Sequence, residues 1–302
     1  MNNIRQLIKP WILPFAMIIG VLFHDYIGKV AFLSPYLIFV MLLITYCRIS
    51  PDRFKIPRYI WMLLAVQIAG SLAVFMAIKP FGLDLAQGAF ICIFCPTATA
   101  APVVTGMLGG SITAIAVYSL ISNIAVALLA PILFSFISPG TDIRFIDSVL
   151  AISAKVLPLI LAPLAIAILL EIFTPRVHDA IARRQSLSFY IWACALIIVV
   201  GNAVSFIMDE PYEKIPEMLL IAFLSLITCC GQFFIGRKIG ARYGEKISGA
   251  QGLGQKNTVL AIWMALTFLN PIASVGPAAY VAWQNTINSL QLFHKAKQSS
   301  KS

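Results

Sequence analysis

Ten apolar segments, each at least 18 residues long, follow one another almost end to end along this chain of 302 residues. Apolar runs of this length predict transmembrane helices. Since 60% of the residues are hydrophobic and only 11% are charged, we expect an all-α polytopic membrane protein. The predicted spans are residues 11–28, 31–48, 58–79, 84–107, 111–138, 146–173, 187–208, 216–236, 247–270 and 272–293.

The basic residues predict how these spans are oriented. With the N-terminus on the cytoplasmic side, sixteen of the 22 lysines and arginines fall in cytoplasmic segments and four in external ones. This bias predicts a multi-pass protein of the inner (plasma) membrane with both termini in the cytoplasm. The net charge of +10 is therefore a topology signal in a protein whose partner is the lipid bilayer, and it does not indicate nucleic acid.

The spans divide into two sets of five, residues 1–140 and 141–302. Because five is odd, the second set is inserted upside down, which predicts the inverted repeat common among secondary transporters. The fourth span of each set is irregular, with the sequences FCPTATAAPVV at 94–104 and GLGQKNTVLA at 252–261. Pro96 and Pro102 each remove a backbone donor, so we expect them to break or kink the first of these helices. Interrupted helices at matching places indicate a transporter's binding site.

The second irregular span contains Lys256, about ten residues into the membrane by this topology. Charged and amide side chains are costly in lipid, so Lys256, Gln255 and Asn257 favour a functional site, with a snorkelling lysine as the alternative. Asn257 and Thr258 are candidates for substrate contact or for helix caps. Thr97 and Thr99 either contact substrate or satisfy the preceding turn. On the fifth span, Ser119, Ser122 and Asn123 share one face, which lines an ion site or makes ordinary interhelical hydrogen bonds.

The sequence lacks the residues that an enzyme or an ATP-driven pump would need. The acids lie at span ends or in loops and no histidine lies mid-span, so we expect no enzyme activity. No phosphate-binding loop of an ATP-driven pump is present in the sequence. The six cysteines lie in or beside apolar segments, which favours neither disulfides nor a metal site, and we expect no cofactor.

The runs CPTATAAPVVTGMLGGS and SLISNIAVALLAP, and GLGQKNTVLA later in the chain, resemble the fourth, fifth and ninth spans of the bile acid:sodium symporter family. The resemblance implies ten helices, with spans 4 and 9 broken and crossing near the bilayer centre. It implies a core domain (about 58–138 and 216–293) that rocks against a panel domain (about 11–48 and 146–208). It also implies a small organic anion as substrate, with sodium bound behind the crossing.

The sequence departs from the family at the implied sodium sites. The first site falls on Ala101, Pro102, Ile115, Ser119 and Gly252, of which only Ser119 has an oxygen-bearing side chain, although hard cations need several oxygens. The second falls on Gln67, Gly252 and Lys256. We therefore expect that sodium is not bound and that the Lys256 ammonium takes its place, hydrogen-bonded to Gln67 and to backbone carbonyls at the helix breaks.

These arguments predict a sodium-independent transporter of an organic anion. Its substrate site would comprise Thr97, Thr99, Pro102, Asn257 and Thr258. Its coupling site would comprise Gln67, Ser119, Ser122, Asn123, Gln255 and Lys256. Two alternatives remain open: a sodium- or proton-coupled symporter of the same fold, and a non-transporting membrane receptor or sensor.

Overall fold

A computed structural model describes residues 15–47, 56–98, 100–138 and 145–299. These residues form helices and their connections, without a β-strand. Within them, six helical stretches are long and apolar enough to cross a membrane: His24–Tyr46, Arg58–Phe81, Ile112–Ile137, Phe145–Phe173, Tyr190–Asp209 and Tyr212–Ala241. The protein is therefore an all-helical, multi-pass integral membrane protein.

The helices of the first half follow the predicted segments closely. Residues 15–22 are helical, and the next elements are α2 (His24–Ile27), η1 (Gly28–Leu33), α3 (Ser34–Tyr46), α4 (Arg58–Ile78), η3 (Lys79–Phe81), α5 (Leu83–Phe94), α6 (Ala101–Leu108) and α7 (Ile112–Ile137). The first predicted span, 11–28, is described from residue 15 on, and its helix is interrupted near its end. Phe23 leaves helical geometry, and a 3₁₀ turn from Gly28 connects directly to α3.

The second half contains one helix that the apolar pattern did not predict. Its elements are α8 (Phe145–Phe173), α9 (Pro175–Ala182), α10 (Gln185–Asp209), η4 (Tyr212–Lys214), α11 (Ile215–Ala241), α12 (Lys246–Gly254), α13 (Thr258–Phe268), η5 (Pro271–Ser274) and α14 (Val275–Ser299). The short helix α9 lies in the segment expected to be a loop. The ends of α11 and α14 extend past the predicted spans, because hydropathy marks where the apolar run ends and not where helical hydrogen bonding ends.

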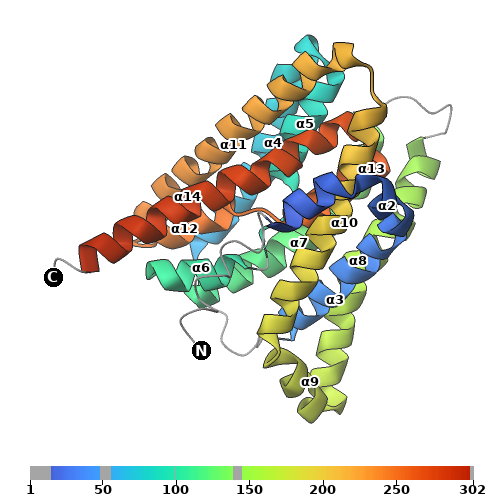
Figure 1. The fold of residues 1–302 in the computed structure, drawn as a ribbon. Coiled ribbons are helices and arrows are strands. Elements are labelled where there is room, and N and C mark those ends of the chain that lie inside the picture. The colour runs from blue at the N-terminus through green and yellow to red at the C-terminus, as the bar shows by residue number, and fades with distance from the viewer. Residues whose placement is uncertain (1–14, 48–55, 99, 139–144, 300–302) are drawn as a thin grey trace.

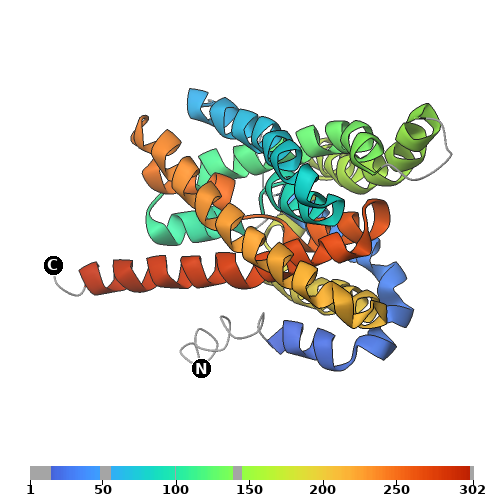
Figure 2. The same ribbon diagram turned by 90° about the horizontal axis from the view of Figure 1, so that it is seen from above.

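The helices form two neighbouring groups (Figure 1). In one group, α10 packs against α2, η1 and α3, and α3 packs against α8. In the other, α4 and α11 flank the short helices α5 and α12, with α14 beside them. Helix α7 packs against α6 and α12 of this group and also against α8 of the first. The C-terminal part of α14 projects beyond the other helices (Figure 2). One apolar core joins the groups, since Ile38 and Leu196 of the first belong to the same cluster as Phe90 and Leu260 of the second.

Candidate functional site at two interrupted helices

The fourth predicted span is interrupted between α5 and α6. Cys95 has φ −57° and ψ 149°, so the helix ends there. This follows from the sequence, because the ring of Pro96 disfavours helical geometry in the residue before it. Pro102 does not break a helix, contrary to expectation. It lies in the first turn of α6, where its missing N–H would have no partner in any case.

The ninth predicted span is interrupted between α12 and α13. Gln255 is extended, with φ −88° and ψ 114°. The next helix begins with a cap, since the Asn257 side-chain oxygen accepts a hydrogen bond from the backbone N–H of Leu260 at 3.2 Å. Gly254 allows close packing at the break, because a Cβ there would overlap the ring of Phe233. Of the two roles weighed for Asn257, the helix cap is thus present.

The two interruptions meet and pair with each other. The N–H of Ala98 donates to the carbonyl of Gln255 at 3.0 Å, and the N–H of Asn257 donates to the carbonyl of Pro96 at 2.8 Å. Thr97 and Lys256 thereby form an isolated antiparallel bridge. The Thr97 hydroxyl also donates to the carbonyl of Gly252 at 2.8 Å. Backbone groups freed by each break are thus satisfied by the other, as a buried site requires.

Lys256 places its ammonium against the end of α5. Its side chain is 1% exposed, and Nζ donates to the carbonyls of Ile93 at 2.7 Å and Cys95 at 3.1 Å. The ion pairs among the described residues involve other groups, at His24, His178 and Lys214. Carbonyls at the negative end of a helix therefore stabilise this charge without a carboxylate. A snorkelling lysine would reach water, so this geometry does not match that alternative.

Gln67 on α4 contacts the same end of α5 and shares one of its carbonyls with Lys256. Its Nε2 donates to the carbonyls of Phe94 at 2.8 Å and Cys95 at 3.2 Å. Its Oε1 accepts from the hydroxyls of Tyr118 and Ser122, each at 2.8 Å. The expected hydrogen bond from Lys256 to Gln67 is therefore not formed. The amide oxygen is occupied by two hydroxyls, and the two side chains share the Cys95 carbonyl instead.

A second amide and tyrosine hold the other break, and sequence reasoning missed them. The Tyr280 hydroxyl on α14 donates to the carbonyl of Gly254 at 2.8 Å and accepts from Gln232 of α11 at 3.0 Å. Gln284, also on α14, accepts from the backbone N–H of Lys256 at 2.9 Å. For Gln232 the available signal was a lone glutamine in an apolar segment, the same signal that Gln67 carries.

Three of the positions matching the first sodium site, Ala101, Ile115 and Gly252, come together in apolar surroundings. Ala98, Ala101 and Ile115 form one buried cluster, and a Cβ on Gly252 would lie 3.1 Å from Cδ1 of Ile115. The Ser119 hydroxyl donates to the carbonyl of Thr97 over 3.4 Å, a long hydrogen bond. Such a cluster offers few oxygen ligands to a hard cation.

Several buried polar atoms beside the crossing have no hydrogen-bond partner in the described part of the chain. They are Nδ2 of Asn257, Oγ1 of Thr258, Oε1 of Gln255 and Oδ1 of Asn123. Nδ2 of Asn123 bonds within its own helix, to the carbonyl of Ser119 at 2.7 Å. Pro102 is buried, and Thr99 lies outside the described residues. Buried polar groups are normally satisfied, so these atoms indicate where a ligand or water would bind.

Comparison of the chain with protein-family models finds no match, and comparison with curated proteins finds none either.

Proposed function

We propose that the chain is a secondary membrane transporter that carries a small organic anion by alternating access without sodium. The observation that carries the proposal is the meeting of two interrupted helices at a buried ammonium, that of Lys256. Irregular backbone at membrane depth is tolerated only where it is buried in protein or lines a cavity. Such breaks in paired positions are typical of the binding sites of transporters.

The proposed topology has ten crossings, arranged as inverted repeats 1–140 and 141–302. Six crossings correspond to the long apolar stretches. The others would be the first predicted span, of which residues 15–22 form a helix ahead of the first long stretch, the pair α5 and α6, the pair α12 and α13, and α14. The two breaks are supported in similar ways, each by a glutamine and a tyrosine that bond to each other. At the end of α5 the glutamine Gln67 contacts the backbone and accepts from Tyr118, and at the end of α12 the tyrosine Tyr280 contacts the backbone and accepts from Gln232.

The absence of a sodium requirement is argued from charge. The ammonium of Lys256 supplies one positive charge and occupies two carbonyls, those of Ile93 and Cys95, that a cation would otherwise use. The residues around Gly252 provide an apolar cluster in place of oxygen ligands. A tethered charge at this place would leave sodium without a site.

An anionic substrate is argued from the helix ends. α6 and α13 both begin at the crossing, so their N-termini direct partial positive charge towards it. Among the described residues, Nδ2 of Asn257 at the start of α13 and the hydroxyl of Thr258 beside it have no hydrogen-bond partner. Together with Lys256 these groups favour a negatively charged ligand such as a carboxylate.

Alternating access is supported by a difference in how the half-helices pack against the two groups of helices. The half-helix α13 packs against α10 and α3 of the other group. The half-helices α6 and α12 make their main contacts with α4, α7, α11 and α14 of their own group. We propose that the two groups are the panel and the core, closed against each other on the α13 side. In the proposed topology that side is external, so this state faces inward.

The test is uptake into proteoliposomes, with organic acids first selected by thermal shift because a ligand of the folded state raises its stability. We expect saturable uptake that is unchanged when choline replaces sodium. Uptake that collapses without sodium would show a sodium symporter. Uptake that follows a pH jump in the wild type, but not in Lys256→Gln, would show proton coupling. Saturable binding without flux would identify a receptor.

A further inference from the structure

The helix α9 (Pro175–Ala182) connects α8 to α10 and has two different faces. On one face His178 is 7% exposed, and Ile181 and Ala182 pack on the main core. These contacts hold α9 against α8 and α3. The helix is therefore docked on the protein with a fixed orientation.

The opposite face is basic. Arg176 and Arg183 are seven residues apart, which places them about 20° from each other around a helix axis. Both are exposed, as is the adjacent Arg184. The acidic groups nearby are Asp179, which lies 3.4 Å from the His178 ring, and Glu171, which is half-buried near the end of α8. Three guanidinium groups thus face solvent beside one exposed carboxylate.

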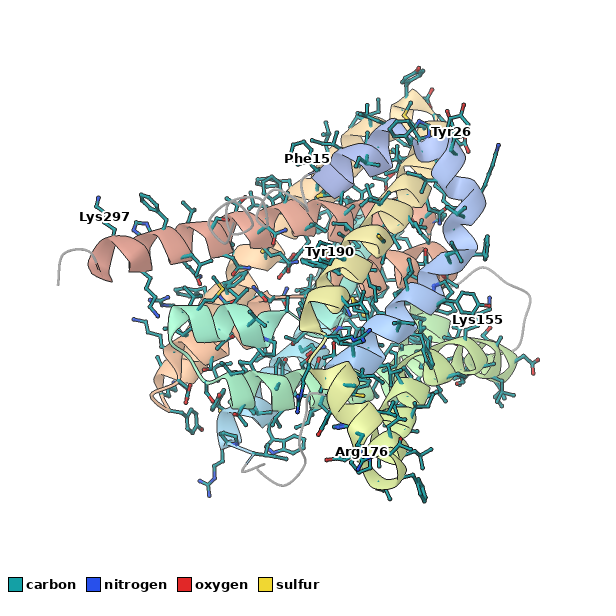
Figure 3. All side chains as sticks on the ribbon, turned by 60° about the horizontal axis from the view of Figure 1, so that its bottom comes forward. Phe15, Tyr26, Lys155, Arg176, Tyr190 and Lys297 are labelled. Atoms are coloured by element: carbon teal, nitrogen blue, oxygen red, sulfur yellow. The ribbon has the colours of Figure 1, made fainter. Side chains whose placement is uncertain are left out.

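Exposed apolar side chains adjoin this basic face. Ile172 and Phe173 at the end of α8 are 64% and 75% exposed, and Val177 of α9 is 47% exposed. On a membrane protein such side chains contact acyl chains. Arg176 lies at the end of the bundle formed by α8, α9 and α10, far from Lys297 at the end of α14 (Figure 3). The arginines and the apolar side chains together are complementary to a phospholipid, which has an anionic phosphate next to apolar chains.

We infer that Arg176, Arg183 and Arg184 hold the phosphate headgroup of an anionic phospholipid whose chains lie along Ile172 and Phe173. Guanidinium groups bind phosphate oxygens in bidentate fashion, which a diffuse surface charge does not do. Basic clusters beside transmembrane helices recognise anionic lipids in this way. The inference does not depend on the transport proposal.

The experiment is native mass spectrometry of the purified full chain titrated with phosphatidylglycerol, cardiolipin or phosphatidylethanolamine. The wild type should retain the two anionic lipids and not the zwitterionic one. The triple variant R176Q/R183Q/R184Q should lose at least about tenfold in apparent affinity. The matched control is R237Q/K238Q/R242Q, which removes the same charge from exposed positions in the last turns of α11 and directly after it, and should bind as the wild type does.

A second variant is needed because removing three basic residues could also change how the protein inserts in the membrane. R176K/R183K/R184K keeps all three charges, so its insertion is preserved, and it should still weaken binding because lysine lacks the bidentate fork. Competition with inorganic phosphate distinguishes a site for a lipid headgroup from a site for free phosphate. We expect phosphate to displace the lipid only at high millimolar concentration. Equal losses in both glutamine triples, or full binding by the lysine triple, would overturn the inference.

Discussion

Lys256 and Gln67 donate hydrogen bonds to one acceptor, the backbone carbonyl of Cys95, at 3.1 and 3.2 Å. One donor comes from the break between α12 and α13, and the other comes from α4. The carbonyl ends α5, so both side chains stabilise the same helix terminus. The proposed coupling site is thus built on the first break and is completed by a charge from the second.

Removing the ammonium should expose a cation site. In Lys256→Ala the carbonyl of Ile93 loses its side-chain donor and that of Cys95 keeps only Gln67, and an unsatisfied buried acceptor costs about 1–3 kcal/mol. A sodium ion can supply the missing charge, so sodium should raise the melting temperature of this variant and not that of the wild type. Lys238→Ala, an exposed lysine over the Phe234 ring, is the control. A variant indifferent to sodium would contradict the tethered-charge proposal.

The Gln67 amide should matter for transport beyond its effect on stability. Gln67→Leu leaves two carbonyls and two hydroxyls with fewer partners, and it should destabilise the fold by about 1–3 kcal/mol in thermal melts. Gln87→Leu is a matched control, because Gln87 is also buried and bonds to the backbone of Ile137 and Asn270. Both variants should melt earlier, but only Gln67→Leu should impair transport. Equal transport defects would reduce Gln67 to a structural role.

Asn257 should bind substrate through the amide group that its cap does not use. Asn257→Ser keeps an oxygen that can cap α13 but removes Nδ2, so the melting temperature should change little. Loss of a hydrogen bond to a charged ligand, worth about 1.5–3 kcal/mol, should weaken binding by roughly 10- to 100-fold. Asn270→Ser, at the cap of η5, should leave affinity unchanged. Unaltered affinity in Asn257→Ser would remove this residue from the proposed site.

The contact between α11 and α12 should tolerate no side chain. A Cβ on Gly236 would overlap the backbone oxygen of Gly249, and the reverse also holds. Gly236→Ala should therefore cost about 1–3 kcal/mol, as overpacking does. Gly231→Ala on the same helix meets no atom within 4 Å and should stabilise it by about 0.5–1 kcal/mol. Thermal melts of the two variants should shift in opposite directions.

Restoring the missing carboxylate should not restore a sodium site. In Gly252→Glu the new Cβ meets Cδ1 of Ile115 at 3.1 Å and Cδ1 of Leu63 at 3.2 Å. Ala98, Ala101 and Ile115 still supply no oxygen, and Lys256 still carries the positive charge. We expect a destabilised protein with no sodium-dependent thermal shift. A clear stabilisation by sodium would show that the site lacks only its acid.

Much of the arrangement could be predicted from local chemistry. Hydropathy located the apolar spans, because each segment must by itself be long and apolar enough to cross the hydrocarbon core of a bilayer. Pro96 located the end of α5 through its effect on Cys95, and the run of glycines and polar residues located the break before Asn257. The expectation of a helix break at Pro102 failed because a proline in the first turn costs nothing. The helix α9 was missed because it is too short and too polar to leave a hydropathy signal.

The sequence by itself determined where the long apolar helices lie and where two of the predicted spans are interrupted. Only the tertiary structure decided what the polar residues at those interruptions contact. Lys256 and Ile93 are 163 residues apart, and Gln67 and Cys95 are 28 apart, so no local pattern relates them. Their shared use of the α5 terminus depends on how α4, α7 and α14 pack around it. Hydrogen-bond partners in a buried site are set by that packing, because each acceptor can serve only the donors that the fold brings within reach.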